Sequence, residues 1–198
     1  MNFWRSRLAR ALHNNPQPVS RYLQLATVRL DHRPANRTVV FRGFLEDTDQ
    51  LKFIVDARTQ KPEQIAYQPW AEACWYFIDT REQFRIAGSL TLVGEAHPDT
   101  TLQQARHNTW CALSDAARLL FAFPHPGKPR ADTGFDVPPP DATQPLAHFC
   151  LLLLEPIEVD YLTLRGEPQN RYLYTKNGDY AALSAKGDRT WSSQEINP

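Results

Sequence analysis

A series of short strand-like segments, joined by turns of hairpin length, limits the folds open to this chain more than any other feature. Residues 84–92 show the pattern most clearly, because apolar and polar side chains alternate there with the period of a half-buried strand. The other predicted strands are 22–30, 37–44, 51–55, 72–79, 148–154, 158–164, 171–175 and a last short one around Trp191. Hairpin spacing favours an antiparallel barrel over a sheet with helical crossovers.

Helical patterns interrupt the strands at three places, so the predicted fold class is mainly β with interposed helices. Within residues 1–18, one helical face gathers Trp4, Leu8, Ala11 and Leu12. This acid-free helix is expected to pack on the domain, and a targeting segment or a membrane-surface helix is the alternative. Pro62 begins a short helix, and residues 101–121 are typical of two helices. Residues 124–146 are rich in proline and predict a long surface loop.

Length, composition and charge predict a single-domain cytoplasmic protein. Its 198 residues predict one domain, 1–198, and the formal net charge of zero gives no general attraction to nucleic acid. The three cysteines are far apart in the sequence, as is typical of reduced thiols in a cytoplasmic protein. The six histidines lack metal-ligand spacing, and no run of about 18 apolar residues occurs. Neither a metal site nor an integral membrane segment is therefore expected.

Two basic segments predict a local anion site. The strand at 37–43 begins at Arg37 and carries Arg42 near its end, and Arg58 and Lys61 come just before the helix at Pro62. Guanidinium, ammonium and helix N–H groups together suit a phosphate monoester. Because the chain has no glycine-rich nucleotide loop, the predicted ligand is a mononucleotide such as FMN.

Four segments in order resemble motifs of the pyridoxamine 5′-phosphate oxidase family: residues 37–43, 61–65, 83–88 and 170–174. The resemblance implies an FMN-binding split β-barrel that forms a homodimer, with the flavin at the subunit interface. No nucleophile with an adjacent base is evident in the sequence, so the cofactor would carry the chemistry.

The resemblance also implies a set of cofactor contacts. The residues concerned are Arg37, Thr38, Val39, Val40, Ile54, Val55, Lys61, Gln83, Ser114, Asp115, Tyr161 and Arg171. Lys61 would bind the phosphate, Arg58 would replace an arginine that the family has at Gln60, and Gln83 would come from the second subunit. Several of these residues could have a purely structural role instead. Ser114 and Asp115 could cap a helix, and Arg171 could be a structural ion-pair partner.

The departures from the family fall on the substrate side. Glu167 and Gln169 stand where the family has an arginine and a histidine, and Arg42 replaces a substrate-binding lysine. The sequence therefore predicts an FMN-dependent oxidoreductase whose substrate and catalytic residues are unknown. One alternative is a genuine pyridoxamine/pyridoxine 5′-phosphate oxidase, with Arg42 and Arg165 replacing the lost contacts. Another is a non-catalytic flavin or tetrapyrrole carrier or sensor on the same barrel.

Overall fold

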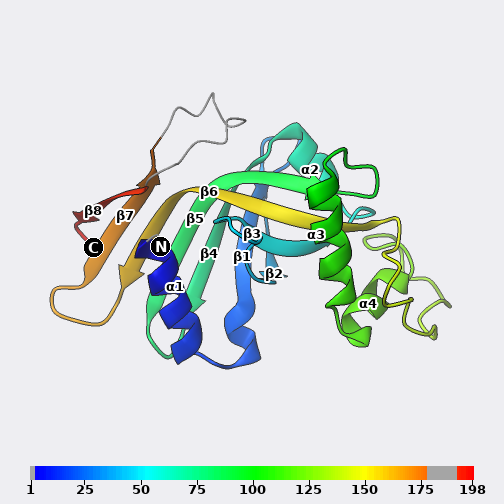
Figure 1. Ribbon diagram of the computed structural model, residues 1–198, viewed down its shortest axis with the longest axis horizontal. Helices are drawn as coiled ribbons and strands as arrows, with labels where there is room; N and C mark the ends of the chain where they lie inside the picture. Colours follow the sequence, from blue (N-terminus) through cyan, green and yellow to red (C-terminus); the bar gives the residue numbers. More distant parts are fainter. Residues whose placement is uncertain (1–2, 178–190) are drawn as a thin grey trace.

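The computed structural model describes residues 3–177 and 191–198, and in these ranges eight antiparallel strands form one curved sheet (Figure 1). They are β1 (Tyr22–Val28), β2 (Pro34–Val40), β3 (Leu51–Asp56), β4 (Trp70–Phe77), β5 (Glu82–Val93), β6 (Phe149–Thr163), β7 (Asn170–Lys176) and β8 (Trp191–Ile196). The order is β2-β1-β4-β5-β6-β7-β8, and β3 pairs with β6. The predicted fold class is confirmed.

The long strand β6 corrects one prediction. The sequence predicted two strands, 148–154 and 158–164, but the chain runs as a single strand through Pro156. Proline is tolerated there because the neighbouring ladders are interrupted. β3 pairs with β6 only as far as Leu154, β7 pairs with it only from Glu158 onward, and the register with β5 shifts between Ala87 and Gly88. Gly88 is required at that shift, since a Cβ atom on it would lie 2.0 Å from the Glu155 carbonyl oxygen.

Strand β2 also differs from its prediction. It was expected at 37–44, but it begins at Pro34 and ends at Val40. Beyond Val40 the chain leaves the ladder and turns at Gly43, whose φ of 99° lies in the left-handed region that favours glycine. Arg42, predicted at the end of this strand, is therefore an exposed residue of the following turn.

The helices are α1 (Phe3–Asn14), α2 (Lys61–Tyr67), α3 (Thr100–Cys111) and α4 (Asp115–Ala122), with a short 3-10 turn at Pro18–Arg21. α1 is shorter than the 1–18 expected. It packs on the sheet as predicted, because Trp4, Leu8 and Ala11 are completely buried. Among the described residues, no helix is long and apolar enough to cross a membrane.

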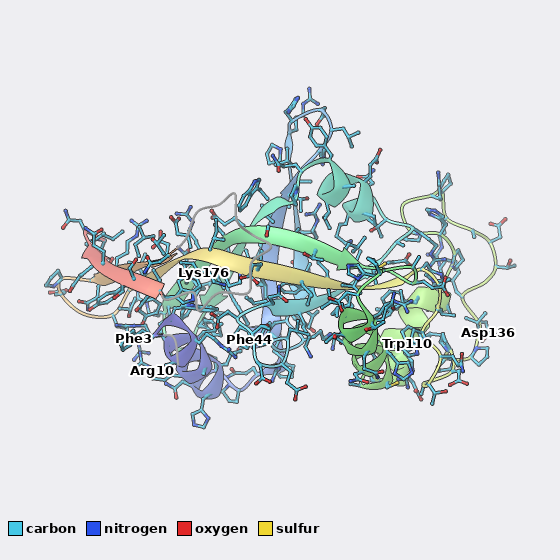
Figure 2. The ribbon with its side chains drawn as sticks, turned by 45° about the horizontal axis from the view of Figure 1, so that its top comes forward. Phe3, Arg10, Phe44, Trp110, Asp136 and Lys176 are labelled. Atoms are coloured by element: carbon cyan, nitrogen blue, oxygen red, sulfur yellow. The ribbon has the colours of Figure 1, made fainter. Side chains whose placement is uncertain are left out.

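The described residues form three hydrophobic clusters, and two of them position most of the chain. The main core lies on the inner face of the sheet and is covered by α1. A second cluster, built on Trp110, Leu113, Phe121 and Phe149, fixes α3 and α4 against β6. In Figure 2, Trp110 of the second cluster lies on α3 toward one end of the molecule, and Phe3 and Arg10 of α1 lie toward the other. α4 leads into residues 123–148, which contain no helix or strand, as predicted for the proline-rich loop.

Candidate functional site

A cationic cavity of about 560 Å³ gathers three of the residues predicted to bind phosphate. It lies between the middle of β2, the turn before α2, the first turn of α2 and the start of the proline-rich loop. Its lining consists of Arg37, Arg58, Thr59, Gln60, Lys61, Glu63, His125, Pro126, Gly127 and Lys128. The structure therefore brings Arg37, Arg58 and Lys61 to one cavity, and phosphate binding by them remains a prediction.

Arg37 reaches the cavity from β2, and its acceptors in the described part of the chain are all neutral. Its guanidinium donates to the Leu25 carbonyl at 3.1 Å, to the Thr27 hydroxyl at 2.6 Å and to the Gln64 amide oxygen at 2.9 Å. Thr27 and Gln64 are themselves buried. Burial, and then the nearby Arg29, lower the pKa of Arg37. The guanidinium is thus fixed in place while its charge remains uncompensated.

Lys61 begins α2 and is half-buried beside Arg37. Its ammonium has no hydrogen-bond acceptor or ion-pair partner in the described part of the chain. Burial, and then Arg37, lower the pKa of Lys61, and the carboxylate of Asp56 offsets this only in part. Arg37 and Lys61 face one cavity, and Arg37 lowers the pKa of Lys61, so an anion bound there stabilises both charges. The donor set therefore fits the phosphate of FMN.

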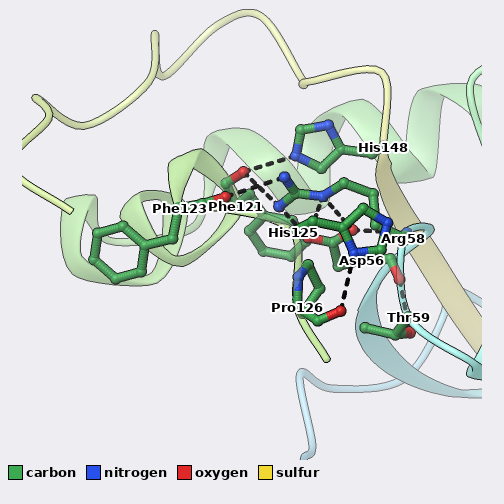
Figure 3. A network of polar contacts seen from close by, with 8 residues as sticks. All are labelled: Asp56, Arg58, Thr59, Phe121, Phe123, His125, Pro126 and His148. Atoms are coloured by element: carbon green, nitrogen blue, oxygen red, sulfur yellow. Dashed lines mark hydrogen bonds and ion pairs between the residues drawn. The ribbon is translucent and has the colours of Figure 1, made fainter. Parts of the chain in front are cut away.

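Arg58 lines the same cavity, but its guanidinium is already paired. It forms a close ion pair with Asp56 at 2.6 Å and donates to the carbonyl oxygens of Phe121 and Phe123, each at 3.0 Å (Figure 3). The pair with Asp56 holds the pKa of that carboxyl below its usual range. The positive charge that the sequence assigned to Arg58 is therefore neutralised within the protein.

The remaining predicted contacts on β2 and β3 divide between core and surface. The side chains of Val39 and Val55 belong to the main core, so only their backbone is available to a ligand. Ile54 packs against the second hydrophobic cluster, the one that fixes α3 and α4. Thr38 is exposed and Val40 is half-buried at the end of β2. A flavin contact by these five residues remains a prediction.

Ser114 and Asp115 lie at the start of α4, where they act as the helix cap that was the alternative to flavin contact. The Ser114 hydroxyl accepts the Ala117 N–H at 3.3 Å, and the Asp115 carboxylate pairs with the buried guanidinium of Arg118. Neither residue lines the cationic cavity. Both side chains therefore have a local role in capping and fixing α4.

Gln83 and Arg171 lie on the outer face of the sheet. The cross-strand register aligns Gln83 of β5 with Leu162 of β6 and Arg171 of β7, which places all three on one face. Tyr161, one residue from Leu162, points to the opposite face, where it is buried and donates to Glu82 at 2.6 Å. Neither Gln83 nor Arg171 lines the cationic cavity of its own chain.

The outer face also holds an acid that was not predicted. Asp160 accepts two hydrogen bonds from Arg171, at 2.9 and 2.6 Å. It also pairs with Arg85 at 3.4 Å, and Arg85 pairs with Glu72 at 2.8 Å. The sequence does carry a signal for this. Val159 and Tyr161 are two apolar residues on either side of Asp160, so they predict that both face the core and that Asp160 lies on the outer face.

The predicted substrate residues lie away from the cavity. Glu167 and Gln169 are exposed in the turn between β6 and β7, and Arg42 is exposed after β2. In Figure 1 this turn is at the left end of the molecule, whereas α4 and the proline-rich loop are at the right. The sequence-predicted site is therefore divided between two regions of one chain.

The antiparallel fold and its cationic cavity point to the class of split-barrel FMN-binding proteins, and comparisons with known proteins agree. The family model described as "Pyridoxamine 5′-phosphate oxidase, FMN-binding domain" matches residues 1–94. The chain is 39% identical over 198 residues to pyridoxine/pyridoxamine 5′-phosphate oxidase 2 of Arabidopsis thaliana, with 98% of this chain and 96% of that protein covered.

Solved structures show the same relationship. A pyridoxamine 5′-phosphate oxidase-related, FMN binding protein from Nostoc punctiforme PCC 73102 is 55% identical, with a TM-score of 0.92 and coverage of 100% of this chain and 99% of that one. PhzG from Burkholderia lata 383, solved with tetrahydrophenazine-1-carboxylic acid, has the same fold at 17% identity, with a TM-score of 0.73 and coverage of 98% and 91%. The chain belongs to the pyridoxamine 5′-phosphate oxidase-related family of FMN-binding proteins. FMN, the cofactor expected from the sequence, is the cofactor of this family.

Proposed function

We propose that this protein is a homodimeric FMN-dependent oxidoreductase in which Arg37 and Lys61 bind the cofactor phosphate. The observation that carries the proposal is the pair of cations in one cavity without an acidic partner in the described chain. FMN, when bound, supplies hydride or electron transfer to a substrate. The protein's own contribution is to fix the phosphate and so orient the flavin ring.

The proposed dimer rests on the division of the predicted site. Gln83 and Arg171 belong to the outer face of β5–β7, and neither they nor the β6–β7 turn line the cavity of the same chain. In a two-fold dimer, the outer face of one subunit can lie against the cavity of the other. Each flavin site would then use Arg37 and Lys61 of one subunit and Gln83 of its partner.

We further propose that pyridoxamine and pyridoxine 5′-phosphates are poor substrates. Glu167 places a carboxylate where the family has an arginine, and Gln169 cannot titrate near neutral pH as a histidine does. Arg165 keeps its charge, but its guanidinium is directed to the Asp79 carbonyl, so it does not take the place of the family's arginine at Glu167. Unfavourable charge at a binding site costs several kcal/mol.

The second candidate is a genuine pyridoxine/pyridoxamine 5′-phosphate oxidase, which the name of the Arabidopsis thaliana relative favours. Aerobic turnover of pyridoxamine 5′-phosphate by the FMN-loaded protein, followed as aldehyde formation, separates the two. We expect turnover far below about one per second, the lower end for typical enzymes. The paired variant Glu167→Arg/Gln169→His should raise it. Turnover of about one per second or more by the unchanged protein would establish the second candidate.

A further inference from the structure

We infer that Lys128, at the start of the proline-rich loop, is a further phosphate-binding residue of this cavity, and that Arg58 acts by holding that loop in place. The inference rests on the proposed FMN site and adds residues to it. The loop was expected only to be a surface feature, yet residues 125–128 line the cavity together with Arg37 and Lys61.

Because Arg58 is paired with Asp56, the site lacks one of the free cations that the sequence predicted. Gln60 carries no charge where the family has an arginine, and Arg58 is neutralised by Asp56. Lys128 also lines the cavity, and its ammonium has no ion pair or hydrogen bond with the residues that the structure describes. It is exposed, so it can move to the phosphate without breaking another contact.

The balance of charge on the lining favours an anion. Apart from the neutralised Arg58, the cations are Arg37, Lys61 and Lys128, and the acid is Glu63, which is exposed on the first turn of α2. Cations therefore outnumber acids around the cavity. Because the protein as a whole has a net charge of zero, this excess is a local property of the site.

Arg58 connects the wall that carries Lys128 to the sheet. Its guanidinium, fixed by Asp56 at the end of β3, donates to the last carbonyls of α4, those of Phe121 and Phe123 (Figure 3). His148 reaches the same Phe121 carbonyl at 2.7 Å. The chain enters the cavity wall two residues after Phe123, so these bonds fix where His125 to Lys128 begin. Arg58 is thus a positioning residue.

The test compares FMN with riboflavin, which has the same ring system and no phosphate. Affinities are measured by the quenching of flavin fluorescence on titration with apoprotein. Lys128→Ala should weaken FMN binding about threefold to tenfold and leave riboflavin binding unchanged, an effect limited by the exposure of the side chain. Lys128→Arg should retain wild-type affinity. Arg130→Ala is the matched control, since Arg130 is a cation of the same loop whose guanidinium lies over the Phe135 ring.

The role of Arg58 is tested with the paired variant Asp56→Asn/Arg58→Gln, which removes both charges and leaves the net charge unchanged. If Arg58 acts through the loop, this variant weakens FMN binding in the wild-type background and has little further effect when Lys128 is already alanine. Additive losses would instead make Arg58 a direct ligand and overturn its positioning role. Wild-type FMN affinity in Lys128→Ala would overturn the inference on Lys128, whereas a wild-type protein that binds no FMN would reject the proposed function itself.

Discussion

At the level of single residues, the proposed phosphate site depends on two cations that the protein holds in different ways. Arg37 is fixed by three neutral acceptors, while Lys61 has no partner in the described chain. A phosphate would give both cations an anion to pair with, and it would replace water in a half-buried site. The energetic consequence is therefore expected in ligand binding more than in the stability of the apoprotein.

Removing either cation should weaken FMN binding without unfolding the chain. Charge-assisted hydrogen bonds contribute about 1.5–3 kcal/mol, so Arg37→Ala and Lys61→Ala should each lower FMN affinity roughly tenfold to a hundredfold. Riboflavin affinity should change little, because riboflavin lacks the phosphate. Lys52→Ala, which removes a half-buried lysine outside the cavity lining, is the control. Wild-type FMN affinity in both variants would show that the phosphate binds elsewhere.

The lowered pKa of Lys61 predicts a dependence on pH above neutrality. Because burial and Arg37 lower it, the folded apoprotein releases this proton at a lower pH than the unfolded chain does. Apoprotein stability therefore gains as pH rises through the interval between the two pKa values. Phosphate binding needs the protonated amine, so FMN affinity should fall over the same rise in pH. Titrations from neutral to alkaline pH should show this fall in the wild type, and a fall of equal size in Lys61→Ala would assign it to another group.

At the level of helices and strands, most strands could be predicted from the sequence. The alternation of apolar and polar side chains along a strand shows directly which face is buried. Ser114 was likewise recognisable as a helix start from local residue types. The single strand β6 was not predictable, because the tolerance of Pro156 depends on where β3 and β7 end along it. The Arg58 contacts and the loop wall of the cavity join residues more than 60 positions apart, and no local pattern encodes such contacts.

Helix α1 should contribute strongly to stability through one side chain. Trp4 is fully buried, so Trp4→Ala should lower the free energy of unfolding by about 3–5 kcal/mol. Trp4→Phe should cost much less, because the indole N–H is buried without a hydrogen-bond partner. Phe3→Ala, on the exposed face of the same helix, should change stability by no more than about 0.5 kcal/mol. Urea unfolding measures all three, and equal losses for Trp4→Ala and Phe3→Ala would contradict the packing of α1.

At the level of the whole molecule, the flavin site that we propose is built from two subunits. Lys61→Ala and Gln83→Ala should both weaken FMN binding in their own homodimers. Co-expression of the two variants should restore one wild-type site in each mixed dimer, built from the intact Lys61 of one chain and the intact Gln83 of the other. Affinity titration of the isolated mixed dimer measures this. A mixed dimer in which every site remains weak would place both residues in one subunit's site.

The most direct test of the central claim is the visible spectrum of the purified protein, followed by release and identification of its chromophore. The proposed FMN site predicts a yellow protein with oxidised-flavin absorbance that releases FMN, not FAD, at one molecule per chain. It also predicts that apoprotein recovers the spectrum when FMN is added, and that Lys61→Ala needs more FMN to do so. A colourless protein that fails to take up added FMN, or one that releases FAD, would contradict it.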